Sequence, residues 1–218
     1  MSVFRSITVV VFSIIFWTTL PACSVAATEK PADHANLLVL GDSWSAEYGL
    51  KRGTGWVALL EAKLKQSSGL SKIRVINASV SGETTAGGLS RLPALLEKHK
   101  PRWVLIALGG NDALRGLPIE TTRAQLTSMI RKSKESGAQV LLIGMRMPPN
   151  YGDYGRAFEN LFPNLSRSQK VALVPFLMRG KEFDLDLFQS DRIHPNEDAQ
   201  PHMLEQAWPP LQQLLKKS

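Results

Sequence analysis

The stretch Asn36-Leu37-Leu38-Val39-Leu40-Gly41-Asp42-Ser43 is the part of the sequence that decides the fold. A short apolar run that ends at a glycine and two polar residues is typical of a strand buried in a parallel sheet, followed by a turn. Four further short apolar runs follow it, at residues 73–77, 103–108, 140–144 and 171–174. Their continuous rather than alternating hydrophobicity predicts a parallel sheet that is covered on both faces.

Helical patterns separate the apolar runs. Trp56, Leu60 and Leu64 recur every four residues, which places them on one face of a helix. Similar patterns lie within residues 89–96, 126–130 and 158–165, and from residue 197 to the C-terminus. We expect Pro163 to interrupt the fourth helix and Pro209-Pro210 to break the last one, because proline lacks an amide hydrogen. Strand and helix alternate, which predicts an α/β fold: a three-layer α/β/α sandwich around a five-stranded parallel sheet.

Residues 1–27 differ in composition from the rest of the chain. Arg5 is their only charged residue, an apolar run spans residues 7–20, and small residues follow as far as Ala26 and Ala27. This order is typical of a secretory signal peptide, and the run is shorter than the ~20 residues that span a bilayer. We expect cleavage after Ala26 or Ala27, export across the inner membrane to the periplasm, and one domain over residues 28–218. The alternative is a lipoprotein, because residues 20–23 resemble a lipoprotein box that ends at Cys23.

Charge and cysteine content exclude several kinds of site. Cys23 is the only cysteine, so the predicted mature domain has no thiol for a disulfide, a nucleophile or a metal site. Removing Arg5 lowers the formal net charge from +7 to +6. A basic surface favours anionic partners, but we find no aromatic-basic cluster typical of nucleic-acid binding. We therefore expect no nucleic-acid partner, and we leave peripheral membrane contact open.

Polar and glycine-containing motifs follow the predicted strands. In open α/β sheets, active sites collect outside the carboxyl ends of the strands. Four motifs occupy such positions or the last loop: Gly41-Asp42-Ser43, the segment 77–84 with Gly82, Gly109-Gly110-Asn111-Asp112, and Asp191-Arg192-Ile193-His194.

These motifs together contain the groups that acyl transfer needs. Ser43, which we expect to open a helix, is the candidate nucleophile, and His194 is the candidate base. Asp191 stands three residues before His194, so a tight turn can bring its carboxylate to one ring nitrogen and leave the other for Ser43. Gly82 and Asn111 can supply hydrogen-bond donors to an oxyanion. Taken singly, each pattern also fits ordinary turn and cap residues, including a helix N-cap at Ser43.

In combination and order, the four motifs resemble those of the SGNH (GDSL) hydrolase superfamily. The segments at 77–85, 101–104, 108–116 and 193–201 are similar to its bacterial thioesterase I/lysophospholipase and arylesterase branch. The resemblance implies the flavodoxin-like SGNH hydrolase fold. It also implies that Ser43 attacks the acyl carbon, that His194 moves the proton, and that Asp191 orients His194. The oxyanion hole would consist of the Ser43 N–H, the Gly82 N–H and the Asn111 side chain.

The resemblance has further implications for specificity. It implies a covalent acyl-enzyme with no metal ion or organic cofactor, and a substrate-binding loop of Leu114, Arg115, Leu117 and Pro118 that shapes the acyl-chain site. Trp44 stands where the family usually has leucine. We expect its ring to pack in the core, the alternative being that it narrows the acyl site.

The sequence thus predicts a monomeric serine esterase or thioesterase. Its substrate would be a small-molecule acyl ester or lipid: a lysophospholipid, an aryl ester or an acyl thioester. One alternative is a carbohydrate O-acetyl esterase that acts on the cell wall. A second is a non-catalytic periplasmic binding module on a similar α/β framework, in which Ser43, Asp191 and His194 are incidental turn and cap residues.

Overall fold

Five parallel strands form the centre of the domain. A computed structural model of the protein describes residues 34–216, so the predicted signal peptide and Cys23 lie outside the described residues. The strands are β1 (Ala35–Gly41), β2 (Ile73–Asn77), β3 (Trp103–Ala107), β4 (Gln139–Ile143) and β5 (Ala172–Val174), in the spatial order β2-β1-β3-β4-β5. The predicted five-stranded parallel sheet is confirmed.

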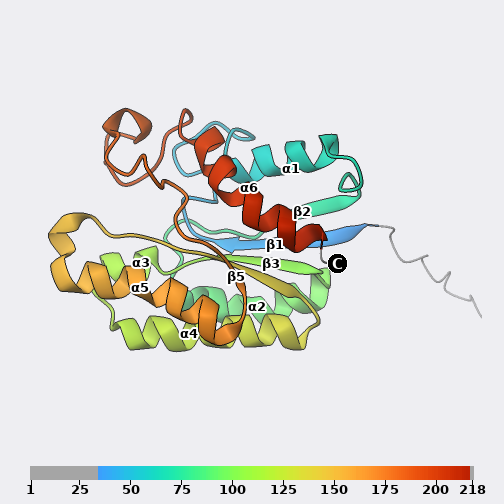
Figure 1. Ribbon diagram of the computed structural model, residues 1–218, viewed down its shortest axis with the longest axis horizontal. Coiled ribbons are helices and arrows are strands. Elements are labelled where there is room, and N and C mark those ends of the chain that lie inside the picture. Colours follow the sequence, from blue (N-terminus) through green and yellow to red (C-terminus); the bar gives the residue numbers. More distant parts are fainter. Residues whose placement is uncertain (1–33, 217–218) are drawn as a thin grey trace, which may run out of the picture. The chain divides into compact units, whose positions relative to one another are not determined.

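Helices cover both faces of this sheet (Figure 1). One face carries α1 (Trp56–Gln66) and α6 (Gln200–Lys216), which contact each other; the other carries α2 (Thr85–His99), α4 (Ile119–Glu135) and α5 (Gly152–Gln169). A short α3 (Gly110–Leu114) and two 3₁₀ turns, Pro149–Tyr151 and Leu185–Leu187, lie in the connections. The three-layer sandwich is therefore confirmed. None of the helices within residues 34–216 is long and apolar enough to cross a membrane.

Two separate apolar cores result from this layering. Trp56, Leu60 and Met203 belong to the core between the sheet and α1 and α6, and all three are fully buried. Leu126 and Phe158 belong to the core on the opposite face. Burial of each such side chain contributes about 1.5–3 kcal/mol, so the sheet is fixed from both sides.

The predicted helix breaks at the internal prolines are wrong. Pro163 lies inside α5, and Pro209 and Pro210 lie inside α6. A proline in a helix costs about 3 kcal/mol. Buried apolar side chains flank each proline on both sides: Phe158, Leu161, Phe162 and Leu165 in α5, and Met203, Ala207, Leu211 and Leu214 in α6. Their combined burial outweighs the cost, so both helices continue.

The strand order brings two of the four motifs to the same point. The chain leaves β1 toward β2 on one side and returns to β3 on the other. Such a reversal opens a crevice at the carboxyl ends of the two central strands. Gly41 ends β1 and pairs with Ala107 at the end of β3, so the segments beginning at Asp42 and at Leu108 both start there.

Candidate active site

The segment after β1, residues 42–55, is here named the nucleophile loop. The expected helix at Ser43 is absent, because residues 43–49 form consecutive turns. Asp42 holds these turns: its Oδ1 accepts the Trp44 N–H at 3.1 Å, and its carbonyl oxygen accepts the Ala46 N–H at 2.9 Å. The Ser43 hydroxyl faces another partner.

That partner is His194, which lies on the connection between β5 and α6, residues 175–199, here named the base loop. His194 Nε2 is 2.9 Å from Ser43 Oγ, and His194 Nδ1 is 2.6 Å from Asp191 Oδ2. Asp191 Oδ1 accepts the backbone N–H groups of Ile193 at 2.9 Å and of His194 at 3.0 Å. The structure therefore joins serine, imidazole and carboxylate in one continuous chain of hydrogen bonds.

The charge of Asp191 determines which ring nitrogen of His194 carries the proton. Burial acts to raise the pKa of Asp191, but hydrogen bonds from the backbone and ring of His194 and from the Ile193 N–H lower this pKa to about 2. The carboxylate is therefore ionised at neutral pH and accepts the Nδ1–H. In neutral imidazole the other nitrogen is then an acceptor, so Nε2 can take the proton of Ser43.

Gly82 and Asn111 come from two segments that are bonded to each other: the connection after β2 and the start of α3. Gly82 follows β2 and has φ of +77°. Asn111 lies in the first turn of α3, and its Nδ2 donates to the Glu83 carbonyl at 3.0 Å. The buried Asp112 accepts the Thr85 N–H at 2.9 Å and also contacts the Thr85 hydroxyl. These bonds bring the two segments together; the oxyanion role of Gly82 and Asn111 stays a prediction.

Comparison with known proteins identifies the family. A family model described as the GDSL-like lipase/acylhydrolase family matches residues 39–200. The chain belongs to this family. Esterase TesA of Pseudomonas aeruginosa is 48% identical over 180 residues, which cover 82% of this chain and 89% of that relative. Thioesterase 1/protease 1/lysophospholipase L1 of Escherichia coli K12 is 43% identical over 182 residues, or 83% and 85% of the two chains.

A solved structure agrees with the fold of this GDSL-family member. The crystal structure of TesA has a TM-score of 0.79 and 48% identity, and the match covers 82% of this chain and 99% of that chain. The family resemblance and the fold expected from the sequence are thereby confirmed.

The predicted substrate-binding loop lies beside Gly82. Leu114 is exposed, and Arg115 Nη2 donates to the Gly82 carbonyl at 3.2 Å. The Leu117 carbonyl accepts the Tyr154 hydroxyl at 2.7 Å, and Pro118 directly precedes α4. In this GDSL-family member the loop is therefore tied to the glycine predicted for the oxyanion hole. Its contribution to an acyl-chain site stays a prediction.

Two residues next to Ser43 have structural contacts. Trp44 packs against the core on the α1 and α6 side, with its ring centroid 5.9 Å from that of Phe176, in agreement with the expected core packing. Asp42 is almost completely buried. Burial raises the pKa of Asp42 to about 7, the backbone hydrogen bond from Trp44 opposes this, and the charge of Asp112 adds to it.

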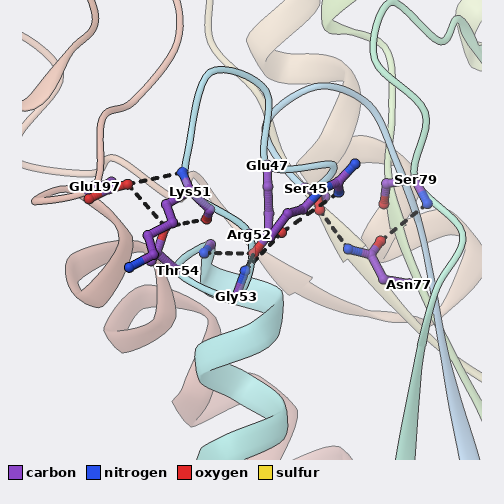
Figure 2. A network of polar contacts seen from close by, with 10 residues as sticks. Ser45, Glu47, Lys51, Arg52, Gly53, Thr54, Asn77, Ser79 and Glu197 are labelled. Atoms are coloured by element: carbon purple, nitrogen blue, oxygen red, sulfur yellow. Dashed lines mark hydrogen bonds and ion pairs between the residues drawn. The ribbon is translucent and has the colours of Figure 1, made fainter.

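Sequence reasoning missed the residues that hold the nucleophile loop in shape (Figure 2). The Glu47 carboxylate accepts the N–H groups of Gly53 at 3.0 Å and of Gly55 at 2.9 Å. Asn77 Nδ2 donates to the Ser45 carbonyl at 2.7 Å, and Glu197 accepts the Lys51 N–H at 3.0 Å. The contacts of Asn77 and Glu197 join segments 32 and 146 positions apart, so nothing in the local sequence indicates them. The contacts of Glu47 lie within the loop and depend on its turns.

The acidic and histidine side chains of the described residues do not gather as metal ligands do. Within residues 34–216, no group of three or more His, Cys, Asp or Glu side chains is arranged to hold a metal ion.

Proposed function

We propose that this chain hydrolyses carboxylic esters and thioesters of acyl chains, with Ser43 as nucleophile, His194 as general base and acid, and Asp191 as the residue that orients His194. One observation carries the proposal: His194 Nε2 lies 2.9 Å from Ser43 Oγ while its Nδ1 lies 2.6 Å from Asp191. These distances are within the range in which a base can take the proton of a nucleophile.

The proposed reaction has two steps. In the first, Ser43 Oγ attacks the acyl carbon and its proton passes to His194 Nε2. The oxyanion is bound by the N–H groups of Ser43 and Gly82 and the Asn111 amide. The C–O or C–S bond then breaks, the leaving group takes the proton from Nε2, and the acyl group remains on Ser43. In the second, water attacks the acyl-enzyme, gives its proton to His194, and releases the acid as Ser43 recovers its hydrogen.

Exposed apolar side chains favour acyl chains as substrates. Tyr48, Val80, Leu114 and Ile193 are each more than two-fifths exposed. Tyr48 lies in the nucleophile loop, Val80 precedes Gly82 by two residues, Leu114 ends α3, and Ile193 directly precedes His194. Apolar surface around a few polar groups is typical of small-molecule sites. The names of the relatives, an esterase and a thioesterase/lysophospholipase, point the same way. We propose lysophospholipids, aryl esters and acyl thioesters as candidate substrates.

Replacement of the nucleophile tests the function. We expect Ser43→Ala to lower kcat on a soluble p-nitrophenyl acyl ester about 10⁵-fold or more, and to abolish labelling by a fluorophosphonate probe. Ser90→Ala, at an exposed position of α2, is the matched control and should retain both. Turnover that survives Ser43→Ala rules out this nucleophile. A folded wild-type protein with neither turnover nor labelling would support the non-catalytic binding module instead.

A series of acyl esters of increasing chain length tests the substrate class. We expect acyl chains longer than acetyl to be hydrolysed, because the exposed apolar side chains can contact them. A strict preference for acetyl would favour the carbohydrate O-acetyl esterase.

We also propose export to the periplasm, based on the composition of residues 1–27, and a monomeric domain that contacts membranes peripherally. The intact mass of protein from the periplasmic fraction identifies the cleavage site and any lipid on Cys23. Size-exclusion chromatography and sedimentation with vesicles test the other two points.

A further inference from the structure

The distance between Ser43 and His194 depends on how two loops lie against each other. The two residues are 151 positions apart, whereas Asp191 and His194 share one turn. Local sequence can set the Asp191–His194 contact, but it cannot set the Ser43–His194 contact. That contact requires the base loop to be fastened to the nucleophile loop close to both residues.

Gln189 has one side-chain nitrogen bonded to both loops. Its Nε2 donates to the Tyr48 carbonyl of the nucleophile loop at 2.9 Å and to the Pro195 carbonyl of the base loop at 3.2 Å. A primary amide has two N–H donors, so each is directed to one loop. Of the two acceptor residues, Pro195 directly follows His194, and Tyr48 lies five residues after Ser43.

The backbone of Gln189 also closes the turn that carries His194. Its N–H donates to the His194 carbonyl at 2.8 Å, and its carbonyl accepts the Arg192 N–H at 2.9 Å. Phe188 and Pro195 form an antiparallel bridge beside this pair. The Gln189 side chain and the imidazole therefore belong to one tight hairpin.

Gly49 permits the close approach of the two loops. Its φ is +70°, and a Cβ at this position would lie 2.1 Å from Gln189 Oε1. Any other residue at position 49 would push the amide away from the Tyr48 carbonyl.

Tyr48 adds a contact to the face of the imidazole. Its ring centroid lies 4.5 Å from that of His194, with an angle of 40° between the planes. Tyr48 is 49% exposed, so the core does not fix its ring. Its backbone is held from both sides: the Tyr48 N–H donates to the Ser43 carbonyl at 3.3 Å, and the Tyr48 carbonyl accepts from Gln189. Gln189 thus places both the imidazole and the ring that lies against it.

We propose that Gln189 is a positioning residue: its side-chain amide fastens the nucleophile loop to the base loop and so holds His194 Nε2 within hydrogen-bonding distance of Ser43 Oγ. This inference rests on the proposed function. It adds a residue that touches neither substrate nor reacting atoms but sets the geometry of those that do. Displacements of about 1 Å in such geometry can cost about 100-fold in rate.

Gln189→Met tests the proposal, because methionine has similar length but no N–H donor. We expect kcat on a short soluble ester to fall about 10- to 30-fold, since about 1.4 kcal/mol corresponds to tenfold and two hydrogen bonds are lost. KM on this short ester should change less than about twofold, because Gln189 is not proposed to contact substrate and a short acyl chain offers the Tyr48 ring little to contact. Gln213→Met, at an exposed position of α6, is the matched control and should behave as the wild type.

Rates should be expressed per active site, counted by fluorophosphonate labelling at saturation. A role in folding alone would lower the number of labelled sites but leave kcat per labelled site unchanged, and that result overturns the proposal. Unchanged kcat per site at full labelling overturns it as well. Gln189→Asn, whose amide is one methylene too short, is a second and milder variant and should give an intermediate kcat.

The Tyr48 ring gives an independent readout. Tyr48→Ala should lower kcat per site severalfold, and Tyr48→Phe should recover most of that loss because it keeps the ring. In the Gln189→Met background Tyr48→Ala should have a smaller effect, since the ring is already misplaced; full additivity contradicts the coupling. If the wild-type protein is neither labelled by the fluorophosphonate probe nor turns over substrate, the proposed function itself is wrong. That outcome differs from failure of the positioning role, in which the wild type is active and the Gln189 variants match it.

Discussion

Asp191 contacts its own turn and His194 with different oxygens. Oδ1 accepts the backbone N–H groups of Ile193 and His194, and Oδ2 accepts the imidazole N–H at 2.6 Å. An amide oxygen can replace Oδ1 as the acceptor within the turn, but no part of an amide can replace the charge at Oδ2. Asparagine therefore keeps the shape of the turn but removes the negative charge beside His194, the proposed base.

We expect Asp191→Asn to fold normally and to lower kcat about 10³- to 10⁴-fold, because a carboxamide N–H directed at Nδ1 favours the wrong imidazole tautomer. The wild-type pKa of Asp191 is about 2, so its carboxylate stays ionised when activity is measured from pH 5 to 9. The wild-type pH profile in that range therefore does not report this carboxyl. A loss of kcat smaller than about tenfold would contradict the role assigned to Asp191.

At the scale of elements, the site depends on loops that follow short strands. Gly41, Asn77 and Ala107 end β1, β2 and β3, so a few residues beyond each strand suffice to bring Ser43, Gly82 and Asn111 to one edge of the sheet. The base loop is longer and reaches the same edge from β5. It is held there by side-chain bonds, including those of Gln189 and Glu197.

Helix α6 continues through Pro209 and Pro210, and this leads to a prediction about the stability of the protein. Pro209 is exposed and lies between the buried residues Ala207 and Leu211. We expect Pro209→Ala to raise the free energy of unfolding by about 1 kcal/mol, because the new N–H completes the helical hydrogen bonding and the ring clash disappears. The gain is reduced because alanine gives the unfolded chain more freedom.

Urea unfolding of Pro209→Ala and of a control measures this effect. Pro201→Ala is the matched control: Pro201 lies in the first turn of α6, where proline has no hydrogen bond to lose, so it should give no gain. If both substitutions change the free energy of unfolding by the same amount, the two prolines affect stability only by restricting the unfolded chain.

At the scale of the whole molecule, stability responds to a charge buried at the edge of the sheet. Asp42 has a pKa raised to about 7 against an ordinary value of 3.8, because burial penalises its charged form. Between about pH 4 and 7 the folded protein keeps a proton on Asp42 that the unfolded chain has lost. This group therefore stabilises the fold at acid pH, and its contribution is lost as pH rises through about 7.

We expect Asp42→Asn to remove this pH dependence. Asparagine keeps the acceptor for the Trp44 N–H but carries no charge, so the variant should be more stable than the wild type at pH 8, with a smaller difference at pH 5. The gain has an upper limit near 4 kcal/mol, from about 1.4 kcal/mol per pKa unit. Urea unfolding at both pH values measures it, with the exposed Asp186→Asn as control. If the urea unfolding curves of the variant and the wild type coincide at both pH values, Asp42 is not a buried group with a raised pKa.

The sequence by itself determined the order of strands and helices, the covered parallel sheet and the family. These properties follow from short apolar runs, helical spacing and motifs of a few adjacent residues. It also indicated that Asp191 could reach His194, because three residues in a turn fix that distance. Ser43 as a helix start was wrong, since residues 43–49 form turns. The helix breaks at Pro163 and at Pro209-Pro210 were wrong, since the burial of flanking side chains outweighs the proline cost.

Only the tertiary structure decided that Ser43 Oγ meets His194 Nε2 across 151 positions of sequence. It also decided that Gln189 and Tyr48 connect the two loops. Such contacts depend on packing between segments that the sheet brings together, and no local pattern encodes them. From sequence alone, a glutamine that bonds two carbonyls cannot be distinguished from any other polar residue. The physical reason is that hydrogen bonds specify distance and angle, whereas sequence periodicity specifies only which face of an element is buried.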